Sequence, residues 1–256
     1  MKSLVILVFV IIASLQSSLA ENYITQSDAH HANSDDTTFG TVHQHELNYA
    51  AVWGDDNHLT QDNAQYAKGT DIDQSSTNEL LIVGNNNYVQ QSNQADAPKE
   101  DESSLTKILQ TQWNLLAIIG DYNSDQTNPI VQSNYAHAIN EATDAWVNQV
   151  QSNKATVLGT ENYLVQTNNA DVSTTIGTTD TNQVQSNKAT VLGAENYLIQ
   201  TNNADVSATM IANQDQKNLA LLIGTSSQFT LPKSPEKSPI VNIDEFDSIL
   251  LDPKIA

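Results

Sequence analysis

The chain has 256 residues, with 10 Lys plus Arg against 30 Asp plus Glu, a formal net charge of −20 at pH 7 and no cysteine. This acidity argues against functions that depend on cationic contacts, so we expect no binding to nucleic acid or to anionic membranes. Without cysteine the chain cannot use disulfides, and its stability must come from backbone hydrogen bonds and packing.

Residues 1–20 have the pattern of a secretory signal peptide. Lys2 supplies the positive charge, residues 4–13 the apolar core, and Ser18-Leu19-Ala20 a small-x-small cleavage site. The apolar run is short for a bilayer-spanning helix, and no later run reaches the required length. We therefore expect a secreted, extracellular chain without a membrane span, with a retained N-terminal anchor as the alternative. Loss of Lys2 would change the formal charge from −20 to −21.

Residues 21–46 are polar and contain several histidines, which predicts a poorly ordered or capping segment. From residue 47 to residue 224 an apolar pair repeatedly precedes a glycine, and a polar turn follows. These glycines are Gly54, Gly84, Gly120, Gly159, Gly193 and Gly224. An Asn follows most of them three positions later, as at Asn162 and Asn196. Because Gly and Asn adopt positive φ most readily, Gly-x-x-Asn predicts a tight turn.

Residues 148–173 and 182–207 are a near-perfect duplication. They differ only at Thr160 against Ala194 and at Val165 against Ile199, and the distance between their starting points is typical of stacked repeats. Each copy contains the pattern Gln-x-Asn-x-Ala-x-Val twice. Its amides are Gln151, Asn153, Gln166 and Asn168 in the first copy and Gln185, Asn187, Gln200 and Asn202 in the second. Alternation with period two predicts strands that carry these residues on one face.

Long and short steps alternate between successive Gln-x-Asn patterns, which start at Gln132, Gln151, Gln166, Gln185 and Gln200. One coil therefore has two strands and two unlike turns. Coils stacked ~4.8 Å apart place each residue beside its equivalent in the next coil. Stacked Asn and Gln can then form amide ladders, whereas an isolated buried amide would cost a few kcal/mol. The sequence therefore predicts an all-β fold, a β-solenoid of stacked strand–turn–strand repeats, over residues 47–224.

Two stretches depart from the repeat. Residues 97–106 are charged and contain Pro98, which predicts a surface loop within the array. Residues 225–256 form an acidic segment with several prolines, which predicts a disordered C-terminal tail. The acidic and apolar stretch 243–251 has three interpretations: it docks onto a partner, it caps the last coil, or it is inert.

The spacing of Gln, Asn, Gly and Ala resembles the curlin repeats of bacterial curli fibre subunits. The matching turns are Gly159-x-x-Asn162 and Gly193-x-x-Asn196, and the residues that resemble the ladder glutamines are Gln151, Gln166, Gln185 and Gln200. The resemblance covers residues 47–224. The coil here is longer than a curlin repeat, and Ala comes after the Gln of the strand instead of after the Asn of the turn. It implies a cross-β solenoid that assembles into extracellular adhesive or matrix fibres. Convergence on an amide-ladder solenoid is the alternative.

Motifs for catalysis are missing from the sequence. It has no Gly-x-Ser-x-Gly, no His-Glu-x-x-His and no phosphate-binding glycine loop, so we expect neither an enzyme nor a cofactor. His30-His31 and His43-x-His45 have the close spacing of transition-metal ligands. Because no Cys or carboxylate spacing completes a tetrahedral site, no metal site is expected.

Two acidic stretches, Asp71-x-Asp73 and Asp121-x-Asn123-x-Asp125, are similar to the start of a calcium-binding loop. Both lack the glycine at the sixth position and the glutamate at the twelfth. A dedicated calcium site is therefore not expected, whereas weak Ca²⁺ binding by several surface carboxylates stays open.

These observations favour a secreted structural protein that self-assembles through Asn and Gln ladders into fibres or matrix, as functional amyloids do in adhesion and biofilms. An open solenoid end offers unpaired N–H and C=O groups to the next molecule, so self-association is the expected interaction. The alternative is an acidic secreted protein that stays monomeric and binds a mineral surface with Ca²⁺, a polysaccharide or ice.

Overall fold

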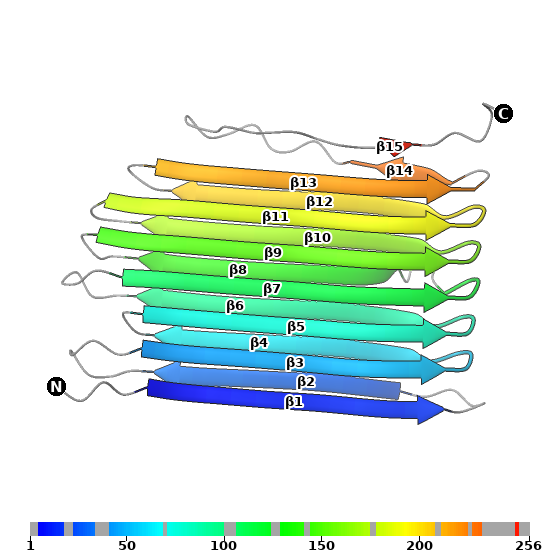
Figure 1. Cartoon of the computed structure of the whole chain (residues 1–256), viewed down its shortest axis with the longest axis horizontal. Coiled ribbons are helices and arrows are strands. Elements are labelled where there is room, and N and C mark those ends of the chain that lie inside the picture. Colours follow the sequence, from blue (N-terminus) through cyan, green and yellow to red (C-terminus); the bar gives the residue numbers. More distant parts are fainter. Residues whose placement is uncertain are drawn as a thin grey trace.

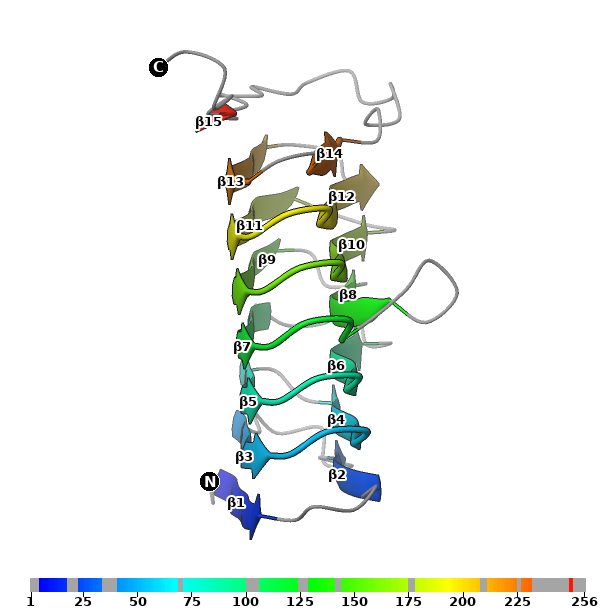
Figure 2. The ribbon, with the colours of Figure 1, turned by 90° about the vertical axis from the view of Figure 1, so that its right-hand side faces the viewer.

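The computed structural model of the chain describes residues 5–17, 23–33, 41–68, 71–99, 106–123, 129–140, 144–174, 178–207, 211–224, 227–231 and 249–250. The predicted all-β solenoid is confirmed: two parallel sheets face each other, and the chain passes from one to the other in every coil (Figures 1 and 2). No helix in the described part of the chain has the length and apolarity that a membrane crossing needs.

The first sheet, sheet A, has eight strands in the order β1 (Val5–Ser17), β3 (Thr41–Trp53), β5 (Asp71–Val83), β7 (Thr106–Ile119), β9 (Asp144–Leu158), β11 (Thr178–Leu192), β13 (Ile211–Ile223) and β15 (Ile249–Leu250). The second, sheet B, has seven: β2 (Tyr23–Asn33), β4 (His58–Lys68), β6 (Tyr88–Lys99), β8 (Ile130–Asn140), β10 (Tyr163–Thr174), β12 (Tyr197–Ser207) and β14 (Gln228–Thr230). Strands next to each other in a sheet therefore come from successive coils.

The duplication sets the register of the middle of the stack. β9 pairs with β11, and β10 with β12, at the offset of the two copies, so Asn153 lies beside Asn187 and Gln166 beside Gln200. Each residue of one copy thus lies beside its equivalent in the other. The same register carries Lys154 beside Lys188 on the outer surface.

Alternate side chains face the space between the sheets. Along β9, Gln151, Asn153 and Ala155 are buried, whereas Ser152 and Lys154 face outward. The interior holds two apolar clusters, one near the glycine turns that includes Val157 and one at the opposite strand ends that includes Val147, with the amides between them. Each fully buried Val, Leu or Ile contributes ~1.5–3 kcal/mol, so the apolar clusters supply a large stabilising term on both sides of the amides.

The array extends beyond the expected boundaries of 47 and 224. β2 and the start of β3 lie within residues 21–46, and β14 and β15 lie within residues 225–256. Residues 21–46 form strands because Ile24, Gln26, Val42 and Gln44 continue the buried period-two pattern without a preceding glycine turn. Residues 232–248 and 251–256 of the tail lie outside the described residues, as do 100–105 of the expected loop; Ala97–Lys99 belongs to β6.

The apolar run expected to act as a signal peptide forms β1, parallel to β3 (Figure 1). Its Val and Ile content suits a strand as well as a signal core, since β-branched residues pack well on a pleated surface. The expected cleavage site at residues 18–20 lies outside the described residues. Cleavage there would remove β1 and leave β3 as the edge of sheet A.

Candidate functional site

The most distinctive interior feature is a pair of Asn columns, one in each sheet. Sheet A contributes Asn48, Asn78, Asn114, Asn153, Asn187 and Asn218, and sheet B contributes Asn63, Asn93, Asn134, Asn168 and Asn202. All of them are buried. They include the four asparagines that the sequence assigned to a ladder.

Asn153 shows how each member of the Asn columns is bonded. Its Nδ2 donates to Oδ1 of Asn187 at 3.0 Å and to Oδ1 of Asn168 at 3.0 Å, and also to the carbonyl of Thr167 at 2.9 Å. Its Oδ1 accepts from Nδ2 of Asn114 at 2.9 Å and from Nδ2 of Asn134 at 3.1 Å. Each amide thus links both sheets and both neighbouring coils, and it donates toward the C-terminal end.

The Gln columns run in the opposite direction. Gln185 Nε2 donates to Gln151 Oε1 at 2.9 Å, and Gln200 Nε2 donates to Gln166 Oε1 at 2.8 Å, so each glutamine bonds to the preceding coil. A second amine hydrogen bond crosses to the other sheet, as from Gln185 to the carbonyl of Asn203 at 2.6 Å. Both the donors and the acceptors of the interior are therefore satisfied through most of the stack.

Sequence reasoning missed one further Gln column. Gln149 and Gln183 are fully buried, and Gln183 Nε2 donates to Gln149 Oε1 at 2.9 Å. The column continues through Gln44, Gln74, Gln110 and Gln214. A signal was present, because Gln149 lies two positions before Gln151 and so belongs to the same face of the strand.

The turns after the sheet A strands combine glycine with a buried Asn. Gly159 has φ 151°, and a Cβ there would overlap the carbonyl oxygen of Gly120 in the preceding coil. The second residue with positive φ in this turn is Glu161, at 55°. The prediction that Asn162 adopts positive φ is therefore wrong. Asn162 is buried, and its backbone N donates to Asn196 Oδ1 at 2.9 Å. The turn asparagines of successive coils therefore lie next to one another and form another column.

The first coil, which here means β2 and β3, breaks the amide pattern. Glu46 occupies the position of Gln151 and Gln185, while Asp28 occupies that of the Asn column in sheet B. Glu46 is 3% exposed, and neither carboxylate oxygen has a hydrogen-bond partner. Burial, together with the negative charge of Asp28, raises the pKa of Glu46 to about 9. A buried acid therefore stands at a position where β5 has Ser76 and where β7, β9, β11 and β13 have a bonded glutamine.

Two groups of ionisable side chains in this coil and in the adjacent strand β5 lie close enough to share a cation. Asp28, His30 and Glu46 have ligand atoms within 4.8 Å of one another on the inner side, and His43, His45 and Asp73 do so on the outer side. Sequence reasoning considered the histidines but could not complete the groups, because Glu46 and Asp73 come from other strands than the histidines that they join.

The acidic stretches compared with calcium loops have other positions. Asp71 and Asp73 lie within β5, so they do not form a loop. Asp121 lies in a turn, where its Oδ1 accepts from the backbone N of Thr160 at 2.7 Å and from Thr160 Oγ1 at 3.0 Å. Asp125 lies outside the described residues.

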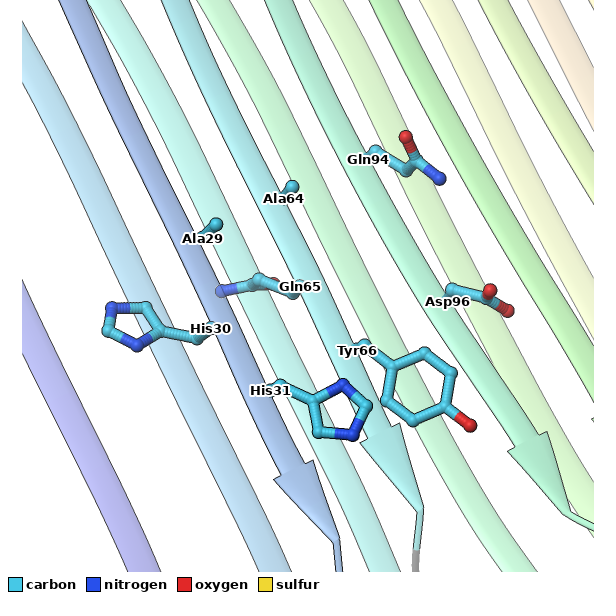
Figure 3. A pocket seen from close by; sticks show the side chains of 8 residues that line it. All are labelled: Ala29, His30, His31, Ala64, Gln65, Tyr66, Gln94 and Asp96. Atoms are coloured by element: carbon cyan, nitrogen blue, oxygen red, sulfur yellow. The ribbon is translucent and has the colours of Figure 1, made fainter.

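A groove of about 260 Å³ lies over β2, β4 and β6. Figure 3 shows the His31 ring beside that of Tyr66, with Asp96 next in the row. The two rings are stacked, with centroids 4.2 Å apart and 5° between their planes. Ala29 and Ala64 also line the groove, and their small side chains leave room beside the rings.

Comparison of the chain with protein-family models, with curated proteins and with solved structures finds no match. Its function must therefore be argued from its own ladders, ends and surfaces.

Proposed function

We propose that the protein is a secreted structural protein that self-assembles end to end, with one solenoid stacked on the next, into extracellular fibres or matrix. The observation that carries this proposal is that the Asn and Gln columns are directional and end unfinished. The resemblance to curlin repeats supports the same function.

At the C-terminal end, the described residues leave most of the last coil without a neighbouring strand. β15 pairs only with Leu221 and Leu222 of β13, and β14 only with residues 197–199 of β12. Gln200 Oε1 is buried and has no hydrogen-bond partner. Asn218 accepts from Asn187 at 3.0 Å, and no further Asn among the described residues follows it in its column to receive its own amine. This end therefore offers amide donors and acceptors as well as backbone groups.

At the N-terminal end, removal of residues 1–20 would free β3. Asn48 Oδ1 has no hydrogen-bond partner within the described residues. A second copy stacked in register would place its Asn48 beside Asn218 and its Gln44 beside Gln214, which continues both columns. The donor of one end then meets the acceptor of the other.

Glu46 works against this contact. In the stacked pair it would lie beside Gln216, whose Nε2 already donates to Gln185 at 3.0 Å and whose Oε1 needs a donor. Because the pKa of Glu46 is about 9, its carboxyl group has one O–H donor at neutral pH and none once it ionises, whereas an amide has two N–H donors. Replacement of Glu46 by Gln supplies the missing donor and should favour assembly.

Net charge also opposes assembly. The secreted chain would carry −21, and like charges on stacked molecules repel until salt, cations or acid reduce them. Because the isoelectric point is about 4.2, we expect fibre formation to accelerate as the pH falls toward 4.

The test uses the chain that begins at Glu21, incubated over a pH series with a chelator. We expect fibres by electron microscopy, rising thioflavin fluorescence and a ~4.8 Å fibre reflection. Glu46→Gln should shorten the lag at pH 7 because the amide adds a donor at the contact, whereas Glu79→Gln, the same exchange at an exposed position, should have a much smaller effect. A chain that stays monomeric at every pH, without that reflection, contradicts the proposal.

The groove beside His31 and Tyr66 favours a second candidate, a monomeric protein that binds a polysaccharide. Aromatic rings next to Gln94 and Asp96 offer both an apolar face and hydrogen-bonding groups. Retention on immobilised polysaccharides that Tyr66→Ala abolishes, in a chain that forms no fibres, would support this candidate over assembly. Binding of ⁴⁵Ca by the monomer would favour the mineral-matrix form of the same candidate.

A further inference from the structure

Buried acceptors without partners are concentrated in the first coil. Among the described residues, the buried side-chain atoms that lack a hydrogen-bond partner include both carboxylate oxygens of Glu46, Oδ1 of Asn48 and Nε2 of His30. His30 Nε2 lies 3.1 Å from Asp28 Oδ1 but without the alignment of a hydrogen bond. Buried polar groups are nearly always satisfied, so several orphan acceptors in one place call for a missing partner.

The columns explain how this coil lost its donors. In the coils that follow, the Asn column of sheet B donates to the next Asn of sheet A, as Asn63 does to Asn78 at 3.1 Å. Asp28 takes that position in the first coil and, as a carboxylate, has no amine to give to Asn48. Glu46 replaces a glutamine in the same way. The coil has exchanged donors for acceptors, which is the condition that a cation would satisfy.

We propose that Asp28, His30 and Glu46 bind one divalent transition-metal cation, of which Zn²⁺ is the representative, inside the first coil. Two carboxylates balance the charge of the ion, so the occupied site is neutral in the low-dielectric interior. Zn²⁺ takes N and O donors ~2.0–2.2 Å away, which requires them to lie a few ångströms apart. The three ligand atoms already lie within 4.8 Å of one another.

The donor set favours a transition metal over Ca²⁺ or Mg²⁺. Imidazole suits Zn²⁺, Cu²⁺ and Ni²⁺, whereas Ca²⁺ and Mg²⁺ take oxygen donors in larger numbers. An ion can enter, because the side chains of His30 and Asp28 are 19% and 13% exposed. Glu46 is the buried end of the site and reaches it from the opposite sheet.

The outer group of His43, His45 and Asp73 is the appropriate comparison. It also has one carboxylate close to imidazoles, with His43 Nδ1 3.4 Å from Asp73 Oδ2. Its side chains are about a third exposed at His43 and 28% exposed at Asp73, so water already satisfies them. Variants of the outer group therefore control for binding by surface histidines.

The experiment is calorimetric titration of Zn²⁺ into the purified full chain and into the form that begins at Glu21. All three ligands are present in both forms, and the concentrations keep the chain dispersed, so the result does not depend on fibre formation. In the triple variant Asp28→Asn, His30→Gln, Glu46→Gln, each new residue is one that other coils have at the same position, such as Gln65 beside His30. The variant should therefore fold, and circular dichroism checks this.

We expect one Zn²⁺ per chain and a binding constant at least about tenfold weaker in the triple variant, since loss of outer-shell partners alone costs about 10–100-fold. His43→Ala with His45→Ala should bind as tightly as the parent. Zn²⁺ should raise the melting temperature of the parent and leave that of the triple variant unchanged. No saturable binding in either form, equal binding by the triple variant, or loss of binding in the His43 and His45 variant would each overturn the proposal.

Discussion

The coils of β9 to β12 and the first coil, β2 and β3, have the same strand arrangement. They differ in whether their buried polar side chains have hydrogen-bond partners. In the former, Gln151 and Asn153 each donate to and accept from bonded neighbours. In the latter, Glu46 occupies the equivalent position with both oxygens unpartnered. The comparison teaches that stacking satisfies a polar interior only when each side chain both donates and accepts. One acid in a column therefore leaves unpartnered oxygens where the repeated coils have a bonded amide.

The largest effect is expected where the repeated coils approach most closely. Gly159→Ala places a Cβ against the Gly120 carbonyl and forces an L-residue to φ 151°, so it should cost ~3–5 kcal/mol. Guanidinium unfolding measures the change. The control is Ala194→Thr, which takes the residue that the other copy has at this turn position and should change stability by less than ~0.5 kcal/mol.

The Asn column allows the two regions to be compared directly. Asn153→Ala leaves amides and a carbonyl without partners and should cost ~2–4 kcal/mol. Asn48→Ala should cost less, ~1–2 kcal/mol, because it also removes an acceptor that is already unpartnered. Urea unfolding measures the loss of stability in each variant, and equal losses would mean that the unpartnered Oδ1 of Asn48 carries no penalty. Ser152→Ala on the outer face serves as the near-neutral control.

A reciprocal exchange tests the Gln position itself. With a chelator at pH 7.5, Gln151→Glu should destabilise the fold by ~2–3 kcal/mol, because it creates an unpaired buried carboxylate. Glu46→Gln should stabilise it by ~1–2 kcal/mol, since the amide has two N–H donors where the protonated acid has one O–H. Thermal unfolding of both variants measures these shifts, and shifts of the same sign would refute the contrast between the coils.

The smallest expected effect concerns Asp62, which lies between Ser27 and Ser92 on the outer face of sheet B, where the repeated coils have Thr167 and Thr201. Burial raises the pKa of Asp62 above its usual range. The folded chain then holds the proton more tightly than the unfolded chain. The stability contributed by this group is full below the unfolded pKa near 3.8 and is lost as pH rises through the folded pKa.

Asp62→Thr should therefore flatten the pH dependence of stability above pH 4, by ~0.5 kcal/mol because the side chain is partly solvated. Urea unfolding at pH 4 and pH 7 measures the difference between the chain and the variant. A parent chain whose stability rises with pH more steeply than that of the variant would contradict the sign.

The features that could be predicted are those that depend on the spacing of residues along the chain. Features that depend on contacts between coils could not be predicted. The strands of the duplication and the burial of Gln151 and Asn153 follow from period-two alternation and the offset between the two copies. The backbone of Asn162 was wrongly expected to take positive φ, since its backbone N and its Nδ2 both donate to Oδ1 of Asn196 in the next coil, a contact that the local spacing does not show. Strand β2 and the start of β3 were missed because no glycine turn precedes β2, so the array was placed from residue 47 onward.

The sequence by itself determined the fold class, the coil length and the amide face, since side-chain alternation and repeat spacing are properties of the chain alone. Only the tertiary structure decided which side chains meet across the two sheets. The opposite directions of the Asn and Gln columns depend on hydrogen-bond geometry between coils, which no spacing records. The meeting of Asp28, His30 and Glu46 depends on two strands folding face to face, and this contact turned three residues without a motif into a candidate metal site.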